Sequence, residues 1–348
     1  MKKTVLVVVL SCLLLMTAVS GCDSAPNGEV YVYNWGEYID ESIFKDFQRE
    51  YGIRVRYTEF QSNEEMYSTL RFGSAGYDVI IPSDYMISRL INEDMLEELD
   101  FSNIPNYALL DDIYKNLDYD PYGRYSVAYM TGTVGLIYNS AMIEEEITSW
   151  GALFDSNYAG QILMFDNPRD ALGIALKYLG YYQNTTSEAE IREAYELLVG
   201  QKPILQAYVM DQIFLKLESG EAAIGPYYAG DYLIMLESNP DLVFVRPEEG
   251  SNHFVDAMCI PKGANNKTNA EIFINYMCST DISLANMYET YYASANVEAN
   301  RQYSEGMDPE EYEIMFASEE TLGNCDIFTN LPSEILELYD HLWGELKK

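Results

Sequence analysis

The sequence predicts an α/β protein with two domains. Segments of β-branched and aromatic residues alternate with segments of helical periodicity along most of the chain, and this alternation favours a parallel sheet covered on both faces by helices. The chain, 348 residues long, exceeds what one hydrophobic core usually holds. Acidic or hydroxyl side chains follow several expected strands, where open α/β sheets bind ligands. We therefore expect a binding site at the strand ends.

The N-terminal segment indicates export. Lys2 and Lys3 precede an apolar stretch, 5–19, that is too short to make a convincing membrane span. Small residues then come directly before Cys22, a pattern that resembles the lipobox of bacterial lipoproteins and implies a signal peptide over 1–21 and a lipidated Cys22. An ordinary secretory signal is the alternative. We expect a tether over 22–28 and a protein that is exported and lipid-anchored to the bacterial membrane, facing the periplasm or the outer side.

Composition excludes two classes of function. The formal net charge is −35, so the surface repels phosphate backbones and we expect no nucleic-acid partner. Outside the N-terminal segment the cysteines are Cys259, Cys278 and Cys325, without any C-x-x-C spacing. A metal site, a redox site or a cofactor is therefore not expected, whereas one disulfide plus a free thiol stays open.

The first element is a strand that ends in a distinctive cluster. The segment 30–38 begins with β-forming residues and ends in Trp35, Gly36, Glu37 and Tyr38. A carboxylate between two rings offers a charge to an ammonium group and π-faces to its methylenes, which suits an organic cation. A Trp and a Tyr that cap the core beside a solvated Glu are the alternative.

The remaining elements follow from hydrophobic periodicity. Apolar residues at helical spacing predict helices over 40–51, 64–72, 83–90, 171–181 and 189–199 and at the C-terminal end. Alternating or continuous apolar runs predict strands over 53–60, 77–81, 134–138, 161–165, 222–227, 243–246 and 254–260. Two α/β domains joined by more than one crossover fit this order better than two separate domains in series.

Further polar or aromatic residues follow these strands. They are Ser83, Asp84 and Tyr85 after the third strand, the segment 166–170 with Asn167 and Asp170, the pair Tyr227-Tyr228, and the pair Tyr291-Tyr292. Helix N-capping is the alternative for Ser83 and Asn167, because such residues accept a hydrogen bond from an orphan amide. A position at the edge of the core is the alternative for the tyrosine pairs.

Asp256 is the most informative of these residues. It lies inside the apolar run 254–260, and no Lys or Arg stands within four residues on either side. A carboxylate buried there costs several kcal/mol unless a cation or a hydrogen-bond donor meets it. A distant Arg partner or an exposed strand end is the alternative. Together, the candidate carboxylates and rings suit a cation with apolar spacers.

These residues carry a resemblance to a known family. The chain resembles the spermidine/putrescine-binding proteins of bacterial polyamine ABC importers from about residue 29 to its end. The matching motifs, in chain order, are Y-N-W-G-E-Y-I, N-E-x-M-Y, Y-D-V-I-I-P-S-D-Y, S-W, D-N-P-R-D, K-Y-L-G-Y and V-D-A-M-C-I-P. Each motif is short, but seven in the same order are specific.

The resemblance implies a two-lobed periplasmic-binding-protein fold of the class II type, with a ligand cleft between lobes that closes on polyamines such as putrescine or spermidine. It implies lobes of 29–131 plus 256–300 and of 132–255 plus 301–348. The partners implied are the polyamine, the membrane permease subunits of an ABC importer, and the membrane through lipidated Cys22. The implied ligand-binding residues are Trp35, Glu37, Tyr38, Ser83, Asp84, Tyr85, Asn167, Asp170, Tyr228, Phe254, Asp256 and Tyr292.

The resemblance also implies roles for these side chains. Asp256 would hold the central ammonium group, Glu37 and Asp170 the outer ones, and the rings would enclose the methylene chain. Tyr228 and Phe254 stand where the family has tryptophan, so the preferred polyamine is left open. The alternatives are a ferric-ion or other small-ligand receptor of the same fold, suggested by the tyrosine pairs, and a glycosidase with paired carboxylates. An enzyme is not expected, because no nucleophile elbow, H-E-x-x-H motif or phosphate loop is present.

Overall fold

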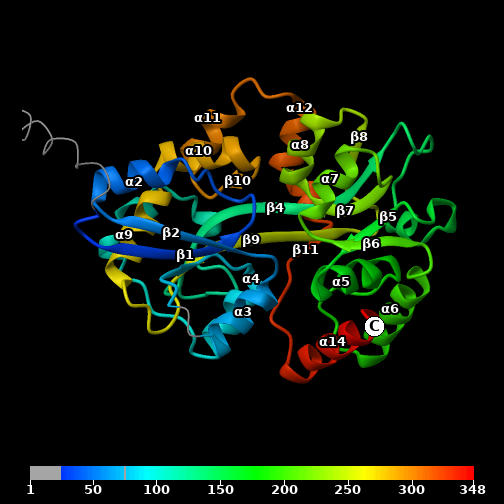
Figure 1. Ribbon diagram of the computed structural model, residues 1–348, viewed down its shortest axis with the longest axis horizontal. Coiled ribbons are helices and arrows are strands. Elements are labelled where there is room, and N and C mark those ends of the chain that lie inside the picture. The colour runs from blue at the N-terminus through cyan, green and yellow to red at the C-terminus, as the bar shows by residue number, and fades with distance from the viewer. Residues whose placement is uncertain (1–24, 74–75) are drawn as a thin grey trace, which may run out of the picture.

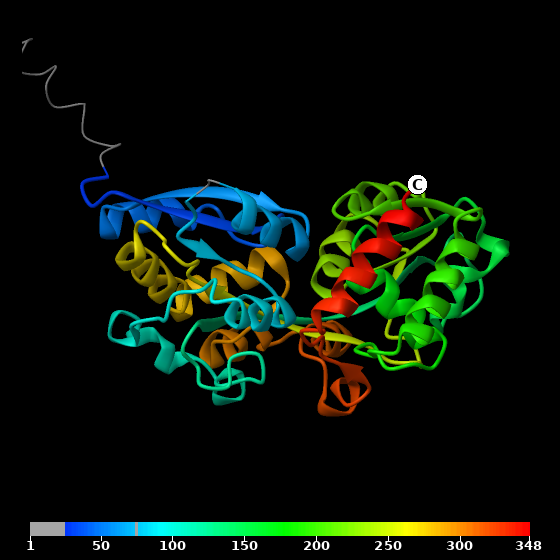
Figure 2. The same ribbon diagram turned by 90° about the horizontal axis from the view of Figure 1, so that it is seen from below.

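The protein has two lobes joined by long strands. We analysed a computed structural model that describes residues 25–73 and 76–348. The expected signal peptide and the lipidation site at Cys22 lie outside the described residues. Figure 2 shows the lobes as two separate bodies, with the N-terminal strands in one and most of the middle and C-terminal segments in the other. In the described part of the chain, no helix combines the length and apolar character needed to cross a membrane.

The sheet runs through both lobes. Its strands are β1 (Glu29–Trp35), β2 (Arg54–Phe60), β3 (Val79–Ile80), β4 (Ser126–Asn139), β5 (Ile162–Phe165), β6 (Leu205–Val209), β7 (Ile224–Tyr228), β8 (Leu242–Val245), β9 (Ser251–Cys259), β10 (Ala293–Ser294) and β11 (Cys325–Asp326). The main order is β2-β1-β3-β9-β4-β7-β5-β6. In Figure 1, β4 and β9 lie side by side and pass from one lobe to the other.

The expectation of a parallel sheet is correct only in part. Strands β1, β2 and β3 are parallel in one lobe, and β5, β6 and β7 are parallel in the other. Strands β4 and β9, however, pair with each other and with β3 and β7 in antiparallel fashion. All 14 residues of β4 are buried, because the strand is covered wherever it runs through a core. Its sequence mixes apolar with small and hydroxyl residues and gave no sign of strand direction, which explains the error.

Helices cover the sheet in both lobes (Figure 1). They are α2 (Ile43–Tyr51), α3 (Asn63–Phe72), α4 (Asp84–Asn92), α5 (Pro168–Tyr178), α6 (Glu188–Gln201), α7 (Gln212–Glu218), α8 (Ala229–Ser238), α9 (Lys267–Met277), α10 (Thr280–Thr290), α11 (Val297–Ser304), α12 (Pro309–Met315), α13 (Glu319–Leu322) and α14 (Ser333–Leu346). Helix α3 does not bury all of the apolar residues that predict it, because its last residue, Phe72, is 79% exposed.

Each lobe has its own hydrophobic core. One core packs Val32, Phe47 and Phe273 with residues of β9, and a neighbouring cluster packs against α3 and α4. The second core surrounds Trp150 and includes Tyr339 of α14. Cys259 and Cys278 are buried, and both, like Cys325, are free thiols. The possible disulfide among them is therefore absent from the described residues.

Candidate functional site

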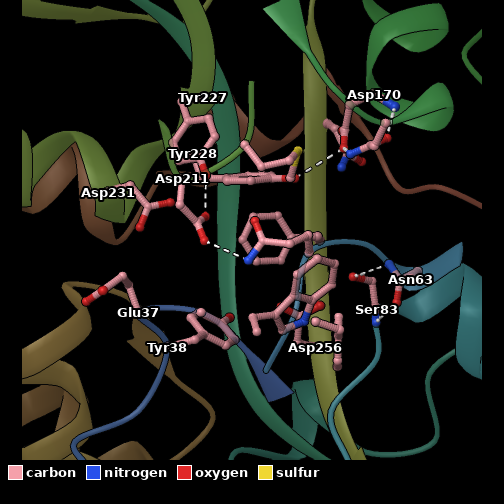
Figure 3. A pocket seen from close by; sticks show the side chains of 18 of the residues that line it. Glu37, Tyr38, Asn63, Ser83, Asp170, Asp211, Tyr227, Tyr228, Asp231 and Asp256 are labelled. Atoms are coloured by element: carbon pink, nitrogen blue, oxygen red, sulfur yellow. Dashed lines mark hydrogen bonds between the residues drawn. The ribbon is translucent and has the colours of Figure 1, made fainter. Parts of the chain in front are cut away.

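A cavity lies between the two lobes, at the carboxyl ends of their parallel strands. Residues after β1, β2 and β3 line it from one lobe, and residues after β5, β6 and β7 line it from the other. The crossing strand β9 supplies its floor through Phe254 and Asp256. Figure 3 shows labelled side chains from all these elements converging on one space. The topology thus brings together segments that are far apart in the sequence.

The structure places all twelve expected site residues around this cavity. Those residues are Trp35, Glu37, Tyr38, Ser83, Asp84, Tyr85, Asn167, Asp170, Tyr228, Phe254, Asp256 and Tyr292. Their shared location agrees with a single site, while ligand binding by each of them stays a prediction.

Sequence reasoning missed several further lining residues. These include three acids, Glu64, Asp211 and Asp231, and the residues Phe60, Gln61, Asn63, Met210, Asn252 and Phe328. Gly36 and Tyr227, which stand in segments singled out from the sequence, also line the cavity. Asp211 follows β6, a strand that the pattern did not predict, and Asp231 lies in the first turn of α8, three residues beyond Tyr228. The rule that acids after strands reach the sheet edge would have found Asp231, whereas Asp211 was hidden because β6 itself was not predicted.

The cavity is strongly acidic. Seven carboxylates line it: Glu37, Glu64, Asp84, Asp170, Asp211, Asp231 and Asp256. Among the described residues that line it, no Lys, Arg or His occurs. A cavity of this kind has a negative potential that low-dielectric walls focus, so it selects cations.

Asp256 lies at the centre of this charge. It is only 4% exposed, and its Oδ1 atom has no hydrogen-bond partner among the described residues. Burial raises the pKa of Asp256 to about 7, although the nearby Ser83 and Tyr38 hydroxyls act in the opposite direction. The alternative of a distant Arg partner is wrong, since Asp256 forms no ion pair within the described ranges. An uncompensated buried carboxylate is costly, so Asp256 is stabilised here either by its own proton or by a cation that enters the cavity.

Asp84 lies beside Asp256. It accepts hydrogen bonds from the backbone amides of Tyr85 at 2.6 Å and Val255 at 3.2 Å. Burial raises the pKa of Asp84 to about 8, and the Asp256 charge adds to this increase. Ser83 occupies the N-cap position of α4 without making a capping hydrogen bond. The capping alternative for Ser83 is therefore wrong.

The second lobe presents two further buried acids. Asp231 accepts a hydrogen bond from the Tyr292 hydroxyl at 2.8 Å, and burial raises the pKa of Asp231 to about 8. Asp170 accepts from the Tyr228 hydroxyl at 3.2 Å, and burial raises its pKa as well. Asn167 caps α5 through the amide of Asp170 at 2.9 Å, so the capping interpretation holds for this residue, which also lines the cavity.

Aromatic rings form the walls between these acids. Tyr228 and Phe254 meet edge to face with centroids 5.6 Å apart, and Phe254 and Tyr292 do so at 5.9 Å. The indole nitrogen of Trp35 donates to the carbonyl of Ile81 at 2.9 Å, which fixes the orientation of the ring. Glu37 has a φ of 49°, an uncommon left-handed conformation that often marks functional sites. Fixed rings between carboxylates suit methylenes between ammonium groups.

The tyrosines are poorly suited to ferric iron. Burial and nearby carboxylates raise the pKa of Tyr227 and of Tyr228 well above its usual value, and in this structure the two hydroxyls donate hydrogen bonds to Asp211 and Asp170. His253 lies outside the cavity lining, and its ring bonds to Thr131 at 2.8 Å. In the described ranges, no group of three or more His, Cys, Asp or Glu side chains is arranged to hold a metal ion.

Comparisons with known proteins agree with this geometry. Residues 74–310 match the family described as bacterial extracellular solute-binding protein. The chain is 32% identical to spermidine/putrescine-binding periplasmic protein 1 of Haemophilus influenzae, covering 93% of this chain and 90% of that one. It is 29% identical to a putrescine-binding periplasmic protein of Pseudomonas aeruginosa, covering 96% of each. A solved structure described as a putative spermidine/putrescine ABC transporter from Listeria monocytogenes is 36% identical with a TM-score of 0.87, over 92% of this chain and 98% of that one.

The chain therefore belongs to the bacterial extracellular solute-binding proteins. Its resemblance to spermidine/putrescine-binding proteins and its two-lobed α/β fold are both confirmed. The family and these relatives are solute-binding proteins rather than enzymes.

Proposed function

We propose that this extracellular solute-binding protein captures polyamines such as putrescine or spermidine by hinge closure and delivers them to an ABC importer. The observation that carries the proposal is the acid-lined, aromatic-walled cavity, in which an oxygen of Asp256 has no hydrogen-bond partner among the described residues. Relatives named for spermidine and putrescine add to it. In this reading, Asp256 and Asp84 hold one ammonium group, while Asp170, Asp231 and Glu37 hold others.

The energetics are sufficient for tight binding. Two or three charge-assisted hydrogen bonds contribute about 1.5–3 kcal/mol each, and several cation–π contacts contribute about 0.5–2 kcal/mol each. Micromolar affinity requires about 8 kcal/mol. Ordering of the ligand and closure of the lobes offset part of the remainder.

The same proposal assigns the lobes. We propose lobes of 29–131 plus 256–300 and of 132–255 plus 301–348, connected where β4 and β9 cross. The separate hydrophobic cores support this division. Met287 and Ala299 nevertheless pack in the second core, which makes α10 and α11 part of the contact between lobes. A receptor of this kind acts by binding and release, without chemistry on its ligand.

The lipoprotein signal gives the setting. We propose that residues 1–21 are removed, that Cys22 carries lipid, and that residues 22–28 tether the receptor beside the importer's permease subunits. Metabolic labelling with a palmitate analogue tests this anchor. We expect labelled wild-type protein and an unlabelled Cys22→Ser variant, and equal labelling of both would contradict the anchor.

Calorimetric titration tests the ligand. We expect one-to-one binding of putrescine or spermidine at micromolar affinity or better, and retention of most of that affinity at high salt. The Asp256→Asn variant should bind at least about a hundredfold more weakly, because a charge-assisted contact to a buried group is lost. A matched control is Asp112→Asn, whose side chain is 94% exposed and lies outside the cavity lining.

Two outcomes would contradict the proposal. Weak binding of many equivalents that salt abolishes would mean that only the acidic surface responds. Unchanged affinity in Asp256→Asn would show that the cavity does not hold the ligand. Ferric iron is the alternative ligand, and a red-brown absorption band on iron loading would identify it.

A further inference from the structure

Asp211 contacts the opposite lobe at the rim of the cavity. Its carboxylate is fixed within its own lobe, because the Tyr227 hydroxyl donates to Oδ1 at 3.0 Å. The other oxygen, Oδ2, accepts from Gln61 Nε2 at 3.1 Å. Gln61 directly follows β2, whereas Asp211 directly precedes α7, 150 residues later. Figure 3 shows both hydrogen bonds of Asp211 as dashed lines, and the one to Gln61 crosses from one lobe to the other.

Gly36 permits this contact. A Cβ atom added at Gly36 would lie 2.8 Å from Asp211 Oδ2, closer than real Cβ contacts. Gly36 does not adopt a positive φ, so its backbone does not require glycine. A side chain at Gly36 would therefore have to displace the Asp211 carboxylate from its present position, and with it the hydrogen bond to Gln61.

We propose that Gly36, Gln61 and Asp211 form a latch between the lobes that exists only in the closed protein and sets how long the ligand stays bound. This inference rests on the proposed function, in that closure of the lobes retains a ligand. Asp211 and Gln61 act here as positioning residues. The latch is partly exposed at the rim, where a hydrogen bond to a charged group keeps a moderate value.

The latch predicts a specific kinetic signature. An interaction made only after closure affects dissociation rather than association. We expect the Gln61→Ala and Gly36→Ala variants to release polyamine about tenfold faster than wild type, with association rates within about twofold. The double variant should lose little more than either single one, because both changes act on the same Asp211 contact.

Stopped-flow fluorescence measures these rates, since Trp35 lines the cavity. Gly200→Ala is the matched control, because Gly200 lies in α6 with no atom within 4 Å of an added Cβ. We expect its rates to equal those of wild type. Dissociation of both latch variants at the wild-type rate would overturn the latch.

A second measurement separates the latch from the identity of the ligand. Small-angle scattering of the ligand-free proteins at pH 6 reports the closed fraction through the radius of gyration. We expect both latch variants to have a larger radius than wild type and Gly200→Ala. If the wild-type protein binds no polyamine, the proposed function fails, and the latch is then tested by the radii of gyration alone. Equal radii of the wild-type and latch-variant proteins would overturn the latch.

Discussion

The affinity of the cavity for a polyamine should depend steeply on pH near neutrality. Burial raises the pKa of Asp256 to about 7 and the pKa values of Asp84 and Asp231 to about 8. The amines of a polyamine titrate near the lysine value of about 10.4, so the ligand stays charged between pH 6 and 8. A bound ammonium group favours the ionised carboxylates. Binding must therefore release protons from the protein.

The size of the effect follows from these pKa values. At pH 7, Asp256 holds about half a proton in the empty site, and Asp84 and Asp231 hold about nine-tenths each. If binding releases about half a proton, as when Asp256 alone contacts the ligand, the affinity falls about threefold for each unit by which the pH is lowered. If binding releases about two protons, the affinity falls about a hundredfold for each unit. Asp84 and Asp256 influence each other, so the protons come off as a set rather than from one residue.

Calorimetry measures this release directly. We expect the observed binding enthalpy at pH 7 to vary linearly with the ionisation enthalpy of the buffer, with a slope of about 0.5–2 protons released. Affinity should rise from pH 6 to pH 8. The Asp256→Asn variant should give a smaller slope for whatever binding it retains, whereas Asp112→Asn should match wild type. A zero slope, with equal affinity at pH 6 and pH 8, would refute the reasoning.

Three further predictions follow from the same groups. The ligand-free protein should lose stability as pH rises. Folding raises the pKa of Asp256 and Asp231 above the unfolded value of 3.8, so their contribution to the free energy of unfolding is full below pH 3.8 and is lost as the pH rises through 7–8. Thermal unfolding with and without putrescine checks this, and we expect the ligand to remove most of the loss. The Tyr228→Phe variant removes the donor to Asp170 and should weaken binding about three- to tenfold, as titration measures; equal affinity would show that this hydroxyl is unimportant. Cys259 and Cys278 should not react with a thiol reagent in the native protein, because burial raises the pKa of both thiols. Rapid modification of either thiol would contradict its buried position. Modification of both thiols after unfolding is the control.

Much of the site could be predicted from local sequence because most of its side chains stand next to a strand end. The cluster after β1 and the acid inside β9 were recognisable from residue type and neighbours alone. Asp211 was not, because β6 is only half-buried and its pattern lacks a clear apolar run. The pairing of β4 with β9 was equally hidden, since two buried strands carry no sequence signal for their direction.

The contact of Gly36 with Asp211 shows a different limit. Sequence places Gly36 beside Trp35 and Glu37, where its lack of a side chain looks like a turn requirement. In the structure, a Cβ added at Gly36 would meet an oxygen of the other lobe at 2.8 Å and displace the Asp211 side chain. A constraint that exists only when two distant segments meet cannot be derived from either segment.

The acids of the cavity and the latch act in opposite directions on closure. The acids of the empty cavity oppose the closed form to the extent that they are ionised, so this repulsion grows as the pH rises through the pKa values of Asp256, Asp84 and Asp231. The contact of Asp211 with Gln61 favours the closed form whether or not a ligand is present. A cation that neutralises the acids removes their repulsion and leaves the contact of Asp211 with Gln61. The ligand therefore shifts the population toward the closed form, because it binds that form more tightly than the open one. A neutral molecule of the same shape would leave the repulsion in place, which makes closure itself selective for charge.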